Sequence, residues 1–531
     1  MTADGGGTGG GGTGGGGAAI ASGSQRPAAE RARGLLLVLA GVLAYVILHF
    51  GFRMLASDVL GEDDTLEQVL VQDLRLGYEA RQPPLYDWVL YAVQQVTGPR
   101  LVSFLAIKYA ALTATAVLIY FAAFRILGDR LWAVLTVESL ALIYQIAWRY
   151  HEGFTHEVLA MVAVAATLVA FLRLYDHGRL RDYILFGVVT GLGVMTEPNY
   201  SVYQMCLWSA ALLQPAIAAR TVRPRLAVSL AIALLIASPW LMWLVSDPAH
   251  WDAIWRATGR GALKDRAIGV KDALRGPIMY LLPLVAILPA VFPGYVATAW
   301  ADVRALWAGT GRRDAPADLE RFVLSTLLAG IVLSLIGGIG LGIGGYAMHV
   351  LMPLYVTSVI WLIAVARRSP RGAGRQALFA KLALAIAVIA LLARLANMFI
   401  HDPVCGKCRW GIPYDGLARA MLERGFATDG TIVAIDDELA GNLRQLFPQA
   451  RVVLGGPRPF RPESVRELSG SIAYVWDSKD PPAKVDAGLA GVPGPGKAAL
   501  AKADLVKVGW AHLWKPDGYR TSDWRLLVER R

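Results

Sequence analysis

Charged residues and cysteines are both scarce in this chain of 531 residues. Only 18% of the residues are charged, 55% are hydrophobic, and three are cysteines. So few cysteines exclude a disulfide framework. So little charge excludes an ordinary soluble protein of this length, and apolar stretches approaching the roughly 20 residues that span a bilayer recur along the chain. We therefore interpret the chain as an α-helical polytopic membrane protein.

Two other classes of function, nucleotide binding and nucleic-acid binding, are also not expected. No GxGxxG motif follows a predicted strand, so nucleotide binding is not expected. The net charge of +11 would suggest nucleic acid as the partner of a soluble protein. Here the basic residues lie between the apolar stretches, as the rule for cytoplasmic loops requires, so we expect membrane lipids and no nucleic acid as partners.

Eleven apolar stretches are predicted to be membrane spans. If the N-terminus is cytoplasmic, every loop on that side of the membrane is basic. An odd number of spans then places the C-terminal region outside the cytoplasm. The predicted spans cover residues 34–53, 101–124, 131–148, 157–173, 183–199, 201–218, 226–246, 278–298, 322–342, 346–366 and 378–400.

Composition divides the chain into three parts. Residues 1–33 begin as a Gly/Thr tract, which predicts a disordered cytoplasmic tail. Residues 34–400 are predicted to form the transmembrane domain, and the loop 54–100 is its first polar segment on the outer side.

Residues 401–531 have the composition of a small soluble α/β unit. The stretches 431–435 and 450–454 are typical of buried strands, and residues 437–447 between them are typical of an amphipathic helix. This β-α-β pattern predicts an accessory domain on the outer side of the membrane.

The outer loop 54–100 carries the residues best suited to catalysis. Three consecutive acids, ending in Asp63 and Asp64, follow the first span, and Pro83-Pro84 forces an extended turn before an aromatic-rich helix start. Aromatic rings at that point suit the lipid headgroup zone. The carboxylates could act as a general base toward a lipid-borne substrate, and a solvated acidic loop is the alternative interpretation.

Two histidines and two glutamates form a dense polar turn, with His151 and His156 each followed by an acid. Two histidines five residues apart do not share a helix face as the HExxH pair of metalloproteases does. Hydrogen bonding to substrate, or simple loop polarity, is the favoured interpretation. No metal ligand is assigned, and dependence on a divalent cation stays open.

Cys405 and Cys408 form a C-x-x-C motif, which suits a redox pair, half of a zinc site or a structural disulfide. No second C-x-x-C completes a four-cysteine site. On the oxidising outer side of the membrane we expect a local disulfide.

Ionisable residues also lie within or at the ends of spans, among them Glu197, His349 and Lys108. Such groups are costly near hydrocarbon unless they face a polar cavity, so they are functional candidates. Cations on the outer face could stabilise a leaving phosphate, or could simply contact lipid headgroups. These cations are Arg81, Arg149, Lys264, Arg266 and Lys271.

Taken together, these motifs resemble the GT-C glycosyltransferases that use polyprenyl-phosphate sugars, the branch with the lipid A aminoarabinose transferases and protein O-mannosyltransferases. Members typically carry an Asp-Glu pair in the first outer loop and then a Pro-Pro-Leu helix start. Here Asp63-Asp64 and the segment 82–86, QPPLY, occupy those places. The sequence is further similar to the rhizobial lipopolysaccharide galacturonosyltransferases in the segment LGYEARQPPLYDW and in Cys405-Gly-Lys-Cys-Arg409 with Gly441-Asn442-Leu443-Arg444. Glu197 departs from the family pattern, in which a lysine is expected.

The resemblance implies a GT-C fold in the bacterial inner membrane, with a periplasmic active site and a periplasmic C-terminal domain. It implies an inverting transfer of a sugar, such as galacturonic acid, from a polyprenyl-phosphate carrier to lipid A or core lipopolysaccharide. By matching position, Asp63 is the expected base and Asp64 a supporting acid. The residues expected to bind substrate are Arg81, Gln82, Tyr86, Arg149, His156, Glu197, Asn199, Lys264 and His349.

Three alternatives remain beside this interpretation. One is a transporter or flippase for a lipid-linked sugar, another a glycosyltransferase with a protein or other glycan acceptor, and the third a membrane scaffold without catalysis. Transporters usually carry charges near the bilayer midplane and paired broken helices. The polar groups here lie mostly at span ends, which favours an enzyme.

Overall fold

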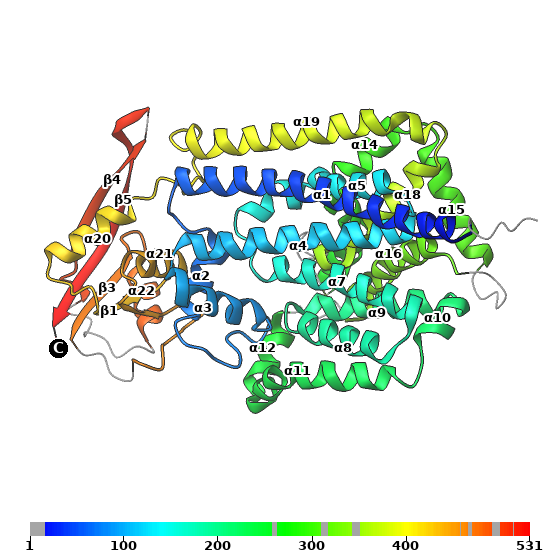
Figure 1. Cartoon of the computed structure of the whole chain (residues 1–531). Coiled ribbons are helices and arrows are strands. Elements are labelled where there is room, and N and C mark those ends of the chain that lie inside the picture. The colour runs from blue at the N-terminus through cyan, green and yellow to red at the C-terminus, as the bar shows by residue number, and fades with distance from the viewer. Residues whose placement is uncertain are drawn as a thin grey trace, which may run out of the picture.

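The computed structural model describes residues 16–257, 263–309, 317–341, 343, 351–456, 458–465, 470–490, 500–512 and 514–530. Long helices form a bundle, and a five-stranded sheet lies at one end of it, opposite the end at which the first helix, α1 (Gly16–Ala56), begins (Figure 1). Two shorter helices, α2 (Glu62–Leu70) and α3 (Leu85–Thr97), lie at the end of the bundle that faces the sheet.

The bundle contains both long helices and short broken ones. Its first half comprises α1 (Gly16–Ala56), α4 (Leu101–Leu127), α5 (Arg130–Glu138), η1 (Ser139–Leu142), α6 (Tyr144–Ala147), η2 (Arg149–His151), α7 (His156–His177), α8 (Leu180–Val194), α9 (Pro198–Leu212) and α10 (Pro215–Thr221). Its second half comprises α11 (Leu226–Ser246), α12 (Pro248–Ala257), α13 (Leu263–Tyr280), α14 (Leu284–Val291), α15 (Tyr295–Gly309), α16 (Leu319–Ile336), η3 (Gly337–Leu341), α17 (Met352–Tyr355), η5 (Val356–Ser358), α18 (Val359–Arg368) and α19 (Gly372–Phe399).

Six helices within the described residues are long and apolar enough to cross a membrane, or up to eight if two bent pairs each count as one span. The predicted count of eleven is therefore not confirmed. The predicted span 201–218 is divided into α9 and α10 with a bend of 116°, and 278–298 into α14 and α15 with a bend of 110°. Pro215 at the start of α10 and Gly294, with φ of 74° before α15, are residues that interrupt helices.

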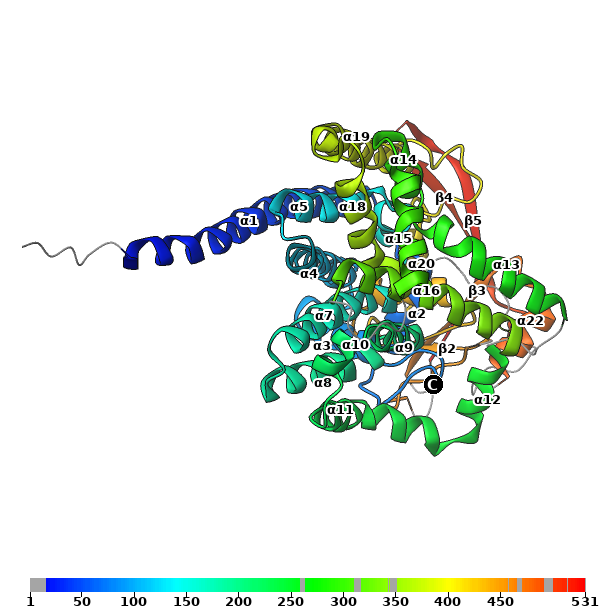
Figure 2. The same ribbon diagram turned by 90° about the vertical axis from the view of Figure 1, so that its right-hand side faces the viewer.

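Burial separates central helices from peripheral ones. The span in α7 is 67% buried, whereas the spans in α1, α11 and α19 are 11%, 28% and 17% buried. Both views place α19 and α11 at opposite edges of the bundle (Figures 1 and 2). The exposed leucines and isoleucines of these outer helices are the surface expected to face lipid.

Some of the predicted features lie partly or wholly outside the residues that the structure describes. The helix α1 begins at Gly16, inside the predicted tail of residues 1–33, and residues 1–15 lie outside the described part. His349 also lies outside the described residues, and Lys264 belongs to α13, with its side chain outside the described part.

The C-terminal region confirms the predicted β-α-β unit. The sheet order is β2-β1-β3-β5-β4, with β1 parallel to β2 and β3, and with β5 antiparallel to β3 and β4. Residues of β1 alternate between two cores, since Ile432 and Ala434 pack on one face and Val433 on the other. The elements are α20 (Tyr414–Glu423), β1 (Thr431–Ala434), α21 (Asp437–Leu446), β2 (Arg451–Leu454), β3 (Ser471–Asp477), α22 (Pro482–Leu489), β4 (Asp504–His512) and β5 (Lys515–Arg530).

The helix α2 belongs to the core of this C-terminal domain as well as to the loop between the first two spans. Its side chains Leu66, Val69 and Leu70 are 4%, 0% and 5% exposed, and they share one apolar cluster with residues of α20 and α21. The domain thus fixes the position of the helix that begins with the candidate catalytic acids.

Candidate functional site

The neighbouring acids of α2 lie in different environments. Asp63 is exposed and lines a hollow of about 190 Å³ at the junction of the bundle and the C-terminal domain. Asp64 is 2% exposed and accepts hydrogen bonds from Lys108 Nζ on both carboxylate oxygens, at 2.8 and 2.9 Å. Only Asp63 is therefore placed to meet a substrate that enters the hollow.

Several cations share the hollow with Asp63. Arg149 is exposed, and its Nη1 lies 3.4 Å from Glu152 Oε2. Lys407 and Arg409 reach the hollow from the loop that follows α19, and Arg409 forms an ion pair with Glu438. A carboxylate that shares a hollow with three cations can accept a proton while the cations attract an anionic group.

The ion pair below the hollow is fully buried. Lys108 of α4 is 1% exposed, so the charge that it carries is compensated by Asp64. Burial raises the pKa of Asp64, and the neighbouring charges of Lys108 and Arg53 oppose that rise. The pair attaches the start of α2 to the second span.

The segment Gly441-Asn442-Leu443-Arg444 is where the C-terminal domain contacts α2. A Cβ at Gly441 would lie 2.4 Å from the backbone oxygen of Thr65, so only glycine allows this approach. Asn442 Oδ1 accepts a hydrogen bond of 2.9 Å from the Leu60 backbone, and Arg444 donates to the backbone oxygen of Gln68. The motif thus positions the segment that contains Asp63.

A second buried group lies one helical turn further along α2. His156 of α7 lies between two carboxylates, with Nδ1 3.7 Å from Glu67 Oε1 and Nε2 3.4 Å from Asp87 Oδ2. The ring of Tyr86, which is fully buried, lies 5.3 Å from the ring of His156. Neither His156 nor Tyr86 is exposed to the hollow, so neither is placed for direct contact with a substrate there.

Arg81 and Gln82 form a tight turn before α3. The backbone of Gln82 donates to Glu79 O at 3.2 Å, and Arg81, which is exposed, has Nη2 3.9 Å from Glu79 Oε2. The next helix is attached to the end of α8, since the Leu85 backbone donates to Met195 O at 3.0 Å. Neither Arg81 nor Gln82 lines the hollow around Asp63.

Glu197 and Asn199 lie together at the start of α9. Glu197 is 7% exposed and accepts a hydrogen bond of 2.8 Å from Asn199 Nδ2. Like Arg81 and Gln82, these two residues do not line the hollow that contains Asp63 and Arg149.

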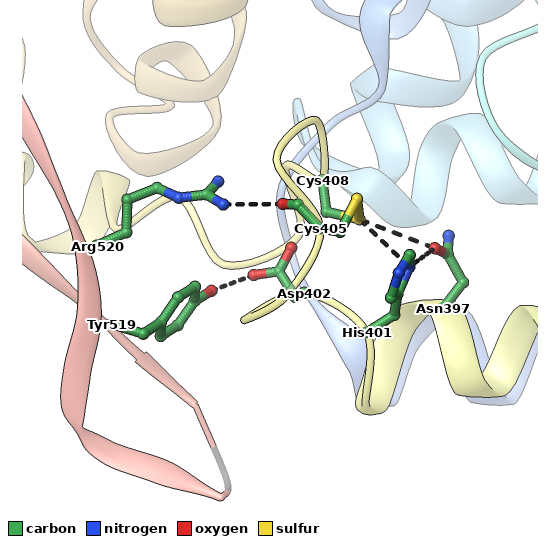
Figure 3. Close-up of a disulfide and its surroundings, with 7 residues drawn as sticks. All are labelled: Asn397, His401, Asp402, Cys405, Cys408, Tyr519 and Arg520. Carbon is green, nitrogen blue, oxygen red and sulfur yellow. Dashed lines mark hydrogen bonds between the residues drawn. A yellow bond between two sulfur atoms is a disulfide. The ribbon is translucent and has the colours of Figure 1, made fainter.

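Cys405 and Cys408 form a disulfide of 2.20 Å in the loop after α19. The loop lies between the end of α19 and strand β5, where Arg520 Nη2 donates to Cys405 O at 2.8 Å and Tyr519 donates to Asp402 (Figure 3). Because Cys408 itself lines the hollow, the disulfide lies beside the cations Lys407 and Arg409.

Four residues of this site were not assigned to it by sequence analysis. Glu67 follows Asp64 by three positions, a spacing that places both on one helix face, and this was the available signal. Asp87 stands inside an aromatic segment that suggested only membrane anchoring. Lys407 and Arg409 were noted only as part of a cysteine motif, because no local pattern shows that this loop folds back over residue 63.

The central part of the chain matches a known protein family. Residues 81–243 match the family described as dolichyl-phosphate-mannose-protein mannosyltransferase. This range begins at the turn before α3 and ends within α11.

Curated relatives match most of the chain. It is 27% identical over 460 residues to lipopolysaccharide core galacturonosyltransferase RgtA of Rhizobium johnstonii, covering 84% of this chain and 88% of the relative. It is also 27% identical over 432 residues to RgtB of the same organism, covering 80% and 84%.

Solved structures of another protein share the fold of this chain. ArnT from Cupriavidus metallidurans, in a crystal structure bound to undecaprenyl phosphate, superposes with a TM-score of 0.59 at 12% identity, covering 92% of this chain and 97% of that one. The apo form of that protein gives a TM-score of 0.57. The chain therefore has the GT-C fold of ArnT, and its residues 81–243 match the model of the dolichyl-phosphate-mannose-protein mannosyltransferase family.

Proposed function

We propose that this protein transfers a sugar from a polyprenyl-phosphate carrier to lipopolysaccharide at the periplasmic face of the bacterial inner membrane. One observation carries the proposal. An exposed carboxylate, Asp63, shares a hollow with Arg149, Lys407 and Arg409 at the end of a membrane bundle. The names of the two rhizobial relatives and the undecaprenyl phosphate bound to ArnT support the acceptor and the donor.

In the proposed reaction the acceptor hydroxyl attacks the anomeric carbon of the donor. The new C–O bond forms as the bond to the carrier phosphate breaks, so that the anomeric configuration inverts. Asp63 takes the hydroxyl proton, and the bonding electrons of the broken bond leave with the phosphate oxygen. Arg149, Lys407 and Arg409 stabilise the charge that develops on this leaving group.

Asp64 acts as a positioning residue in this scheme. Both of its carboxylate oxygens accept hydrogen bonds from Lys108 inside a buried pair, which makes it a poor proton acceptor for a substrate in the hollow. The pair instead holds the first turn of α2, and hence Asp63, against α4.

The donor sugar is proposed to be a uronic acid such as galacturonic acid. The rhizobial relatives are named galacturonosyltransferases, and three cations in one hollow suit a donor that carries a carboxylate in addition to its phosphate. The basic loops at the opposite end of the bundle support a cytoplasmic N-terminus and a periplasmic C-terminal domain.

The test is mass spectrometry of lipid A and core oligosaccharide from a host that lacks such enzymes but makes the lipid-linked uronic acid. Expression of the protein is expected to add one hexuronate mass, and Asp63→Asn is expected to abolish it. Asp58→Asn is the matched control, because Asp58 is an exposed acid of the same loop outside the hollow. Unmodified lipids with the intact protein would contradict the uronic acid assignment.

A protein acceptor is the second candidate, because the matched family is described as protein mannosyltransferases. Expression in the same host distinguishes a protein acceptor from a lipopolysaccharide acceptor. Glycan mass on membrane proteins with unmodified lipopolysaccharide would favour the protein acceptor.

A further inference from the structure

The group Glu67, Asp87 and His156 is a buried polar cluster that the proposed reaction does not use. The residues come from three elements, α2, α3 and α7, and they are 2%, 2% and 1% exposed. One ligand-type atom from each lies within 4.8 Å of the others. Three segments that are distant in sequence thus bring nitrogen and oxygen donors to one point.

The charges of this cluster do not balance by themselves. Among the described residues, the ion pairs of Glu67 and Asp87 are limited to His156, so two buried carboxylates face one imidazole. A buried negative pair requires either a shared proton or a cation.

One polar atom of each residue in this cluster also lacks a hydrogen-bond partner. Within the described part of the chain, Glu67 Oε2, Asp87 Oδ1 and His156 Nε2 are buried and have no hydrogen-bond partner. Unpaired buried atoms are costly and rare in folded proteins, and here three of them belong to one cluster. A shared proton between the carboxylates would leave His156 Nε2 without a partner, whereas a cation bound by all three groups would give Nε2 a partner and balance the two carboxylates.

The donor set selects the kind of cation. One imidazole nitrogen with two carboxylate oxygens suits zinc and neighbouring transition metals, while magnesium and calcium prefer oxygen alone. Donors around tetrahedral zinc lie about 3.4 Å apart, which follows from bonds of about 2.1 Å. The distance of 3.4 Å from His156 Nε2 to Asp87 Oδ2 already has this value, whereas the Glu67 carboxylate, 3.7 Å from Nδ1, has to turn toward Nε2 to share the ion. On its other side, His156 Nδ1 lies 3.2 Å from Thr155 Oγ1, the kind of partner that orients a ligating histidine.

We propose that Glu67, Asp87 and His156 bind one divalent transition-metal ion, for which zinc is the best match. The ion joins α2 and α3 to the span α7, so it fixes the helix that presents Asp63 without touching the substrate hollow. This site is independent of the sugar and of the acceptor, and its occupancy can be measured without any transfer reaction.

The experiment measures metal in the full-length protein, purified in detergent without a histidine tag and without chelator, by inductively coupled plasma mass spectrometry. Glu67→Gln and Asp87→Asn remove one ligand each while keeping side-chain shape. Glu197→Gln is the matched control, a buried carboxylate outside the cluster. Cys405→Ser with Cys408→Ser controls for zinc on the other group with ligand geometry, His401, Cys405 and Cys408.

The wild type and both controls are expected to hold about one equivalent of zinc per chain, and the two cluster variants are expected to lose it. After chelation, added Zn²⁺ is expected to raise the Tm of the wild type but not of the cluster variants. Wild-type protein that retains no metal and shows no Tm shift with Zn²⁺, Mn²⁺ or Co²⁺ would overturn the proposal, as would cluster variants that keep their zinc. If the variants do not fold, X-ray absorption of wild-type zinc decides instead, since a nitrogen and oxygen shell supports the site and a sulfur shell overturns it.

Discussion

One face of α2 packs against the C-terminal domain through apolar contacts, whereas the other contacts the membrane helices through charged and polar side chains. Toward the C-terminal domain the helix presents Leu66, Val69 and Leu70, which are buried in an apolar core. Toward the membrane helices it presents Asp64 and Glu67, which meet Lys108 and His156. The apolar face supplies non-directional stability, whereas the polar face fixes orientation. The position of Asp63 therefore depends on both regions, and each can be disrupted separately.

The largest expected effect follows from removing the base while leaving both faces intact. Asp63→Asn should lower the rate of transfer by about 10²- to 10⁴-fold, the usual contribution of a general base. Because Asp63 is exposed, the Tm should stay near that of the wild type. Quantitative mass spectrometry of the modified lipid measures the rate. A variant that keeps its activity would assign the base elsewhere.

The second largest effect is expected from disrupting the polar face of α2. Lys108→Met leaves the Asp64 carboxylate buried without its partner, which should cost about 3 to 5 kcal/mol of stability. The double variant Lys108→Met with Asp64→Leu should recover part of that loss, because no uncompensated charge remains. Thermal unfolding of the purified protein measures both changes.

A matched control for this pair is Lys381→Met, which changes an exposed lysine on the outer helix α19 and should leave the Tm unchanged. Equal destabilisation by the single and double variants would show that the ion pair is not what holds the first turn of α2.

Breaking the apolar face should have a smaller effect. Gly441→Ala places a Cβ against the Thr65 backbone and forces α2 away from α21, at a cost of about 1 to 3 kcal/mol, partly offset by the higher helix propensity of alanine. Activity should fall although no residue of the hollow changes. Gly509→Ala is the control, since nothing lies within 4 Å of a Cβ there. Equal behaviour of both variants would mean that α2 tolerates the displacement.

Much of this arrangement could be predicted from the sequence, because its signals are local. Short apolar stretches predicted β1 and β2, and an amphipathic pattern predicted α21, to within a residue or so of their bounds. The paired acids and the Pro-Pro turn marked the loop that contains the candidate site. The count of eleven spans is not confirmed, because hydropathy registers apolar content but not the breaks within α9–α10 and α14–α15.

The partners of the site residues could not be predicted, because they depend on contacts between distant segments. Lys108 lies 44 positions from Asp64, and Lys407 reaches the hollow from the loop that follows α19, far along the chain from Asp63. That domain was predicted to be an accessory unit, yet its contact with α2 makes it part of the scaffold of the site.

The smallest expected effect concerns the disulfide, which belongs to neither face of α2 but borders the hollow. Its loop is short, so its loss by Cys405→Ser with Cys408→Ser should cost about 2 kcal/mol or less. Lys407 and Arg409 flank Cys408 and are proposed to stabilise the leaving group, so the looser loop should lower kcat several-fold and change the KM for the lipid-linked donor little. Steady-state kinetics in nanodiscs measures both constants. A reductant should reproduce the effect in the wild type and leave the double variant unchanged, because that variant has no bond to reduce. A reductant that affects the two proteins equally would place the sensitivity outside this loop.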